Sequence, residues 1–330
     1  GTGQMKVSAA AKFNDWGWRI PFLLSIVLVG VSVYIRLKMN ESPLFSKLKS
    51  EGRTSTNPVK ESFAHKRNLK MVLLALFGAT MGQGVVWYTG QFYAQSFLEN
   101  TCKLDFDQSR TILIWAILFA TPFFVVFGAW SDRVGRKWIM VAGMVLAVFT
   151  YRPLFQAMEH ATDLPERWPM AGGSTSTEVL QALPNGDQIR KRTDAFDFAN
   201  GLHVIGVSTD TMFQAQPDHR SRATQTITKQ VPDSIYWKLV GIVFILILYV
   251  TMVYGPIAAF LVELFPTKIR YTSMSLPYHI GNGVFGGLTP FIATLLTTVY
   301  HTDALVGLWY PIAIAGVCLV IGTLYISNRI

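Results

Sequence analysis

The sequence predicts an all-α fold, a polytopic membrane helix bundle with about seven transmembrane helices. Of the 330 residues, 51% are hydrophobic and only 15% are charged, whereas a soluble domain carries about 25% charged residues. The charges are clustered, and the gaps between clusters are about 20 residues long, which is the length that an apolar helix needs to cross a bilayer. Most gaps are apolar on every side, while the helices of a large soluble protein would each show a polar stripe.

The apolar spans and the segments between them follow in a clear order. Trp16 and Trp18 precede the first span and suit the headgroup level of a membrane. Tight polar turns, Ser131–Lys137 and Glu263–Tyr271, require the spans that they join to run antiparallel. The seven predicted spans are Trp18–Leu37, Leu69–Leu98, Thr111–Trp130, Trp138–Met158, Tyr236–Val262, Thr272–Tyr300 and Leu305–Ser327.

Basic residues orient these spans. The formal net charge is +9, which is also typical of nucleic-acid binding, but here Lys and Arg lie at span ends, as in the short cytoplasmic loops of membrane proteins. We therefore expect no nucleic-acid partner. With the Ser131–Lys137 turn inside, the predicted parts are an outer lead-in with the first transmembrane helix (1–37), a cytoplasmic linker (38–68), three transmembrane helices (69–158), an extracytoplasmic insertion (159–235) and three further transmembrane helices (236–330).

Two of the polar parts carry some local structure of their own. In the linker, a short amphipathic helix is predicted for Leu44–Lys49, directly after Pro43. In the insertion, the alternation at Gly201–Val207 is compatible with a short strand, and we expect a small external cap or a partly disordered segment. Cys102 and Cys318 form no framework, so no disulfide is expected.

Four stretches resemble a known family. Asp132–Lys137 resembles the D-R-x-G-R-[KR] turn of the major facilitator superfamily. Three others, Trp16–Phe22, Gly82–Tyr93 and Glu263–Gly283, resemble the bacterial metabolite:proton symporter family, which includes carriers of dicarboxylates, shikimate and proline or betaine. The resemblance implies that the seven spans correspond to helices six to twelve of a twelve-helix transporter. The chain, which starts at a glycine, would then be a C-terminal part without helices one to five.

The turn and a second helix end predict a cytoplasmic gate. Asp132, Arg133 and a carboxylate elsewhere, for which Glu263 is the best candidate, can pair through the arginine in one transport state and separate in the other; the alternative is a turn that only sets topology. Gly135 permits a backbone with positive φ. The residues assigned to the gate are Asp132, Arg133, Gly135, Arg136, Glu263 and Arg270.

Polar residues inside two spans predict a substrate-lining face. In the second span Gln83, Trp87 and Gln91 recur at i, i+4 and i+8, with Tyr88 beside them. In the sixth span Tyr278, His279 and Asn282 share a stripe, and an imidazole changes charge near neutral pH. The alternatives are helix–helix contacts for the amides and a structural role for the histidine.

Arg152 lies inside the fourth span, where an arginine needs a partner, a cavity or room to snorkel. Snorkelling to the outer surface and binding of an anionic substrate are both compatible with its position.

The predicted function is secondary active transport. The carrier would move a small polar metabolite, a carboxylate, with protons by alternating access in the bacterial inner membrane. Its partners would be the small-molecule substrate, protons and the lipid bilayer, and we expect a monomer. No cofactor, metal site or catalytic constellation is expected, so the chain is not predicted to be an enzyme. The alternative is a seven-span receptor or sensor with an extracytoplasmic ligand-binding region.

Overall fold

The computed structural model describes residues 13, 15–39, 43–52, 55–164, 175–182, 188–198, 200–212, 224–300 and 302–326. The chain divides into two units, Gly1–Thr56 and Asn57–Ile330. The first unit holds the 3₁₀ turn η1 (Gly17–Arg19), α2 (Ile20–Lys38) and α3 (Pro43–Ser50). Pro21 lies in the first turn of α2, where its missing N–H costs nothing, and α3 covers the short helix predicted after Pro43.

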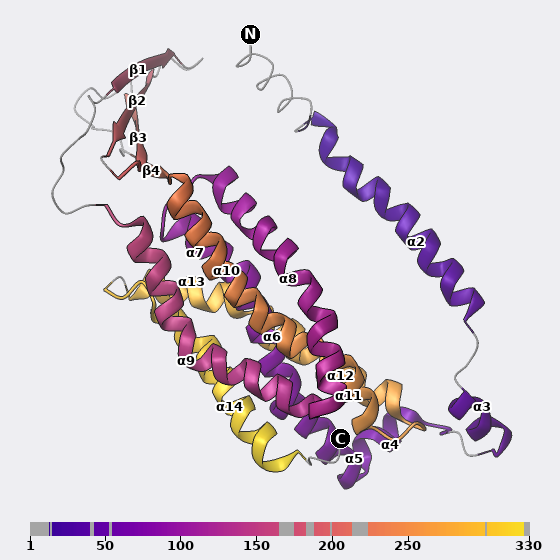
Figure 1. Cartoon of the computed structure of the whole chain (residues 1–330). Helices are drawn as coiled ribbons and strands as arrows, with labels where there is room; N and C mark the ends of the chain where they lie inside the picture. Colours follow the sequence, from indigo (N-terminus) through magenta and orange to yellow (C-terminus); the bar gives the residue numbers. More distant parts are fainter. Residues whose placement is uncertain are drawn as a thin grey trace. The chain divides into compact units, whose positions relative to one another are not determined.

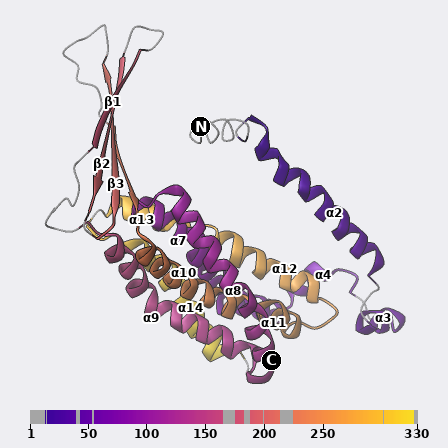
Figure 2. The same ribbon diagram turned by 45° about the horizontal axis from the view of Figure 1, so that its top comes forward.

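The second unit is a helix bundle that carries a small sheet (Figures 1 and 2). Its helical elements, in chain order, are α4 (Pro58–Ala64), α5 (Lys66–Ala75), η2 (Leu76–Thr80), α6 (Met81–Tyr88), η3 (Thr89–Tyr93), α7 (Ala94–Asn100), α8 (Phe106–Val134), α9 (Arg136–Thr162), α10 (Asp233–Tyr254), α11 (Ile257–Leu264), α12 (Arg270–Ile280), η4 (Gly281–Gly286), α13 (Thr289–Val299), η5 (Val306–Leu308) and α14 (Trp309–Tyr325). Three of them, η2, η3 and η4, are π-helical.

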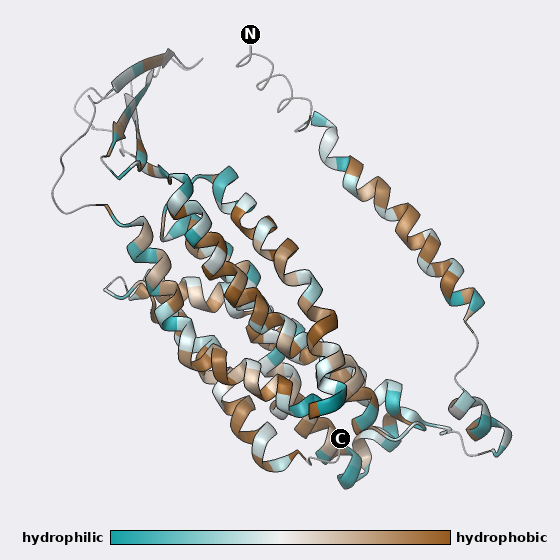
Figure 3. Ribbon diagram, in the orientation of Figure 1, coloured by the Kyte–Doolittle hydropathy of each residue, from teal (hydrophilic) through white to brown (hydrophobic). Residues whose placement is uncertain are grey.

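Seven helices in the described part of the chain are long and apolar enough to cross a membrane, which confirms the predicted helical bundle. Several elements join end to end to make one span: α5 to α7 form the 35-residue helix Lys66–Asn100, and α10 with α11 forms the 32-residue helix Asp233–Leu264. Figure 3 shows apolar residues along the middle of the helices and polar residues toward their ends. This distribution is the one that a bilayer requires.

The core of the bundle is built around α10, which packs against α8 and α9. Val243 and Leu246 of α10 are fully buried. Next to it an aromatic group joins α7 and α9, in which the rings of Phe97 and Phe155 meet edge to face at 5.0 Å and the ring of Tyr93 lies 5.5 Å from Phe155. Burial of large side chains at these contacts stabilises the packing of the helices.

The region between α9 and α10 contains a four-stranded antiparallel sheet, which adds a β element to the predicted all-helical architecture. Its strands are β1 (Thr175–Ala182), β2 (Gln188–Asp197), β3 (His203–Met212) and β4 (Thr224–Gln230), paired in that order. The predicted strand at Gly201–Val207 overlaps the start of β3. The other strands carry few apolar residues in alternation, so they could not be predicted from the residue pattern.

The end of β4 is fastened to the bundle by Lys229. Its Nζ donates to the Thr162 carbonyl at the end of α9 at 2.7 Å, and its backbone N–H donates to the Lys103 carbonyl at 2.7 Å. Burial lowers the pKa of this ammonium from its ordinary value. Beside it, burial raises the pKa of the Cys102 thiol to about 11. Two residues later, Val231 and the Gln108 side chain exchange two hydrogen bonds, of 2.9 and 3.0 Å.

Candidate functional site

Near the middle of the bundle, α6 and η4 approach each other at backbone distance. A Cβ added to Gly84 would lie 2.4 Å from the Gly281 carbonyl oxygen, a distance that no side chain can occupy. The Thr80 hydroxyl donates across the same contact to the Pro277 carbonyl at 2.7 Å. Gly84 and Gly281 therefore allow α6 and η4 to come into direct backbone contact.

Gln83 and Asn282 meet at this crossing. The Gln83 Nε2 donates to the Asn282 Oδ1 at 3.0 Å, and the Asn282 Nδ2 donates back to the Gln83 Oε1 at 3.0 Å. The Asn282 Nδ2 also donates to the Tyr278 carbonyl at 3.0 Å. Gln83 is fully buried, and an amide in an apolar interior is stable only when such partners satisfy it.

An aromatic row extends from the amide pair toward α10. The Trp87 ring stacks on Tyr254 at 6.1 Å, and the Tyr254 and Tyr278 hydroxyls are hydrogen-bonded at 2.9 Å. Tyr88 packs edge-on against Trp87, with ring centroids 4.9 Å apart. Tyr254, the last residue of α10, thus joins the residues assigned to the substrate face.

Gln91 and His279 are held less firmly than the other residues assigned to the substrate face. Gln91 lies within the π-helical η3, so the i, i+4, i+8 spacing of an α-helix does not hold from Trp87 to Gln91. Gln91 is half-buried and His279 is exposed. In the described chain neither side chain has a hydrogen-bond partner, and the His279 ring lies 5.8 Å from that of Tyr278.

At one end of the bundle, Arg136 bridges two carboxylates. Its Nη2 lies 3.1 Å from Asp132 Oδ1 and 2.9 Å from Glu263 Oε1. Gly135, with φ of 103°, makes the turn between α8 and α9 that no L-residue adopts without strain. We call Arg136, Asp132 and Glu263 the turn clamp, because they join α8, α9 and α11.

Two other residues assigned to the gate lie outside the turn clamp. Arg133 is exposed and has no ion-pair partner within the described residues. Arg270 donates from its Nε to the Phe265 carbonyl at 3.1 Å, just beyond the end of α11. The structure therefore places Arg136, rather than Arg133, between the two carboxylates.

The last cation of the same turn has a role that the sequence did not indicate. The Lys137 Nζ donates to the Thr323 and Ile326 carbonyls at 2.9 and 2.6 Å. These carbonyls lie at the C-terminal end of α14, where a lysine satisfies groups that have no helical partner. Lys137 thereby ties the start of α9 to the end of α14.

Arg152, toward the other end of α9, has a partner in Asp303. The Arg152 Nη2 lies 3.2 Å from Asp303 Oδ2, and the guanidinium lies over the Trp309 ring at 5.2 Å. Asp303 is itself held by the Leu305 N–H, which donates to its Oδ1 at 2.9 Å. The ion pair supplies the partner that an arginine within an apolar span needs.

The chain is similar to several bacterial transporters. It is 25% identical over 317 residues to the inner membrane metabolite transport protein YhjE of Escherichia coli, covering 94% of this chain and 54% of that protein. It is 29% identical over 153 residues to the alpha-ketoglutarate permease of Escherichia coli (46% and 34%), and 24% identical over 319 residues to the citrate-proton symporter of Klebsiella pneumoniae (96% and 53%). No family model and no solved structure matches the chain.

The chain spans about half the length of most of the curated relatives that it matches. These relatives are transporters, and the seven membrane-crossing helices together with the similarity to an inner membrane protein confirm the predicted location, a multi-pass protein of the bacterial inner membrane. The resemblance is confirmed as well: over nearly its whole length the chain is similar to bacterial metabolite transporters of the major facilitator type.

Proposed function

We propose that this chain works as the helix-six-to-twelve part of a secondary active transporter that moves a small carboxylate together with protons. The observation that carries this proposal is the polar crossing of α6 and η4, where the Gln83 and Asn282 amides pair beside π-helical segments. Asn282 also donates to the carbonyl of Tyr278, whose hydroxyl is hydrogen-bonded to that of Tyr254. π-Helical turns within α-helices are frequent at functional sites. Among the relatives, an alpha-ketoglutarate permease and a citrate-proton symporter bear names of carboxylate carriers.

The hydrogen-bond inventory of the crossing leaves donors for an anion. Asn282 directs its Nδ2 to Gln83 and to the Tyr278 carbonyl, while Gln83 uses one of its two N–H groups on Asn282. Only one hydroxyl of the Tyr254–Tyr278 pair can donate to the other. Gln83 is fully buried, so its amide positions Asn282, while one tyrosine O–H and the Gln91 amide remain for a carboxylate, which only accepts hydrogen bonds.

Access to the crossing would be controlled at the turn clamp. Asp132 and Glu263 are 62% and 43% exposed, so each ion pair with Arg136 is screened by water and worth about 0–1 kcal/mol. Contacts of this strength can break and reform during each transport cycle. His279, exposed and next to Tyr278, is the group on this stripe best suited to exchange protons with the substrate path.

Uptake measurements test the proposal on the transporter in its native membrane. A panel of carboxylates first identifies one that the wild type takes up. We expect Tyr278→Ala and Gln91→Ala each to reduce uptake of this carboxylate by about tenfold at normal membrane expression, because each variant loses roughly one hydrogen bond to a charged group. Tyr271→Ala, at a tyrosine that is 81% exposed, is the matched control and should not change uptake.

Two results would overturn parts of this proposal. Unchanged uptake in both Tyr278→Ala and Gln91→Ala would remove these residues from the substrate site. Accumulation that persists in the presence of a proton uncoupler would contradict proton symport.

A further inference from the structure

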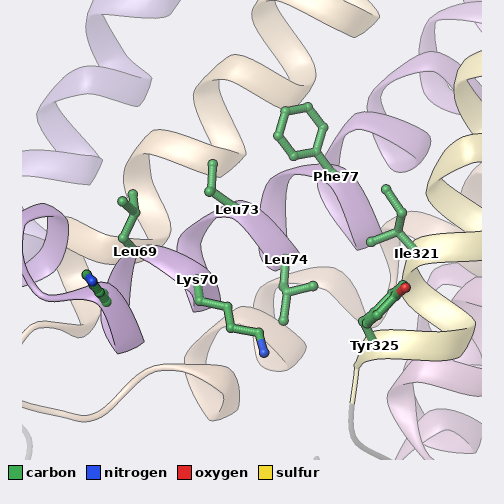
Figure 4. A pocket seen from close by; sticks show the side chains of 8 residues that line it. Leu69, Lys70, Leu73, Leu74, Phe77, Ile321 and Tyr325 are labelled. Carbon is green, nitrogen blue, oxygen red and sulfur yellow. The ribbon is translucent and has the colours of Figure 1, made fainter.

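An apolar groove of about 460 Å³ lies between the start of the Lys66–Asn100 helix and the end of α14. On one side it is lined by α5 and η2, and on the other by Ile321 and Tyr325 of α14 (Figure 4). The lining residues of α5 and η2 recur at helical spacing on one face: Lys66, Leu69, Lys70, Leu73, Leu74 and Phe77. The volume is within the range of about 300–1,000 Å³ that is typical of small-molecule sites.

The groove changes in polarity along its length. Lys66 and Lys70 lie at one end, and only apolar groups line it from Leu73 to Phe77. Eleven residues separate Lys66 from Phe77, which corresponds to roughly 16 Å along a helix. One leaflet of a bilayer has a hydrocarbon depth of about 15 Å, half of the ~30 Å core. The groove therefore has the length and the polarity gradient of a single phospholipid.

The charged end of the groove lies at the membrane surface. It is at the same end of the bundle as the Ser131–Lys137 turn, because Lys137 donates to the Thr323 and Ile326 carbonyls on either side of Tyr325. Tyr325 is 65% exposed, and tyrosines are common at the headgroup level.

The lysines at the groove are not neutralised by the protein. Within the part of the chain that the structure describes, neither Lys66 nor Lys70 has a carboxylate within ion-pair distance, and the groove is lined by no acidic residue. Arg67 adds a third positive charge between them in sequence. A ligand that fills the groove should thus bring a negative charge to this end and a hydrocarbon chain to the other.

We propose that the groove is a binding site for a phospholipid with a net anionic headgroup. An acyl chain lies against Leu73, Leu74 and Phe77, and the phosphate accepts hydrogen bonds from Lys66 and Lys70. Basic pockets between transmembrane helices are known to bind such headgroups. The site does not depend on transport and goes beyond the proposed function.

Lipid binding to the purified chain tests the headgroup. Phosphatidylglycerol and phosphatidylcholine with identical acyl chains are added to the protein in detergent, and bound lipid is counted by native mass spectrometry. We expect phosphatidylglycerol to bind more tightly, and Lys66→Gln/Lys70→Gln to weaken its binding about thirtyfold, since each lysine near an anionic surface contributes about 1 kcal/mol and 1.4 kcal/mol is tenfold. The control Lys191→Gln/Lys238→Gln makes the same charge change at two exposed lysines outside the groove and should leave binding unchanged.

Equal binding of the two lipids, or equal loss in the two double variants, would overturn the proposal. The double variant can be checked for folding by its unfolding midpoint, and it should match the wild type because both lysines are exposed.

Photocrosslinking in native membranes shows which molecule occupies the groove. A photoreactive amino acid replaces Leu73 in the groove or, as control, Leu118 on the surface of α8, where the side chains are 44% and 56% exposed. We expect position 73 to yield adducts enriched in anionic phospholipid relative to position 118. Adducts of position 73 with a protein segment, from this transporter or another, would show that a helix fills the groove and would overturn the proposal.

Discussion

The crossing of α6 and η4 and the turn clamp both hold distant helices together, but by opposite means. The crossing is buried and uncharged: Gly84 lies against the Gly281 carbonyl, and Gln83 is fully buried in a reciprocal pair with Asn282. The turn clamp is charged and open to water, with Asp132 62% exposed. Buried polar contacts are costly to break because the separated groups find no other partner, whereas exposed ion pairs exchange one partner for water.

This difference in burial and charge suits the two regions to different roles. A contact that cannot open cheaply fixes the geometry of a binding site, and a contact that opens at little cost suits a gate. The predictions below test this division by asking whether the crossing is costly to disturb and whether the turn clamp is not.

The largest effect is expected at the backbone contact. Gly84→Ala places a methyl group 2.4 Å from the Gly281 carbonyl oxygen, so the helices must separate, and we expect a loss of about 3 kcal/mol in the free energy of unfolding. Thermal or denaturant unfolding in detergent measures it. Gly283→Ala is the matched control within η4, because nothing lies within 4 Å of its added Cβ. Similar stability of both variants would contradict a close-packed crossing.

The next effect is expected at the amide pair. Gln83→Leu leaves the Asn282 side chain without its partner in an apolar interior, which should cost about 2 kcal/mol in the free energy of unfolding. The double variant Gln83→Leu/Asn282→Leu removes both polar groups and should regain most of that loss. A double variant that loses the sum of both single effects would show that the two amides do not act as a pair.

A smaller effect is expected at the turn clamp. Arg136→Gln should lower the free energy of unfolding by less than about 1 kcal/mol, because the ion pairs are exposed to water. The difference from the wild type should shrink further in 1 M salt, where the screening length is about 3 Å. A loss as large as that of Gln83→Leu would mean that Arg136 is a structural residue rather than part of a reversible gate.

Lys229 combines one property of each region, because it is buried like the crossing and charged like the turn clamp. It therefore tests what burial alone does to a charged group. Burial lowers the pKa of its ammonium in the folded state, so the charged form is disfavoured there relative to the unfolded chain. This penalty is complete at pH values below the folded-state pKa and is relieved as the pH rises toward the ordinary value of 10.5. We expect the stability of the wild type relative to Lys229→Met to rise between pH 7 and pH 10. A difference that does not change with pH would contradict a buried ammonium at this position.

Individual residues show how much of the candidate site could be predicted from the sequence. Gln83 and Asn282 stand out because amides are rare in apolar spans, yet the sequence could not pair two residues that are 199 positions apart. Tyr254 is not among the residues that the sequence assigned to the substrate face, because it lies in another span from its partner Tyr278. The π-helical η3 changes the direction of the Gln91 side chain relative to that of Trp87, and the residue types do not predict a π-helical segment. Asp303, the partner of Arg152, lies in a short polar segment that had no distinguishing feature.

The cations of the turn show the same limit. Arg133, Arg136 and Lys137 are equivalent in sequence as basic residues of one polar turn. In the structure Arg133 is exposed, Arg136 lies between two carboxylates and Lys137 caps α14. Their separate roles depend on which neighbours the packing of α11 and α14 brings to the turn.

By itself the sequence determined the class of the protein, its seven apolar helices, the turn at Gly135 and the relation to metabolite transporters of the major facilitator type. These follow from hydrophobic length, charge position and local motifs, which act over a few residues or a single helix. The tertiary structure alone decided that Gln83 pairs with Asn282, that Arg136 forms the turn clamp, that Lys229 anchors a sheet, and that α5 and α14 leave a groove. Each of these depends on the distance between segments remote in the chain, and that distance is set by how the helices pack.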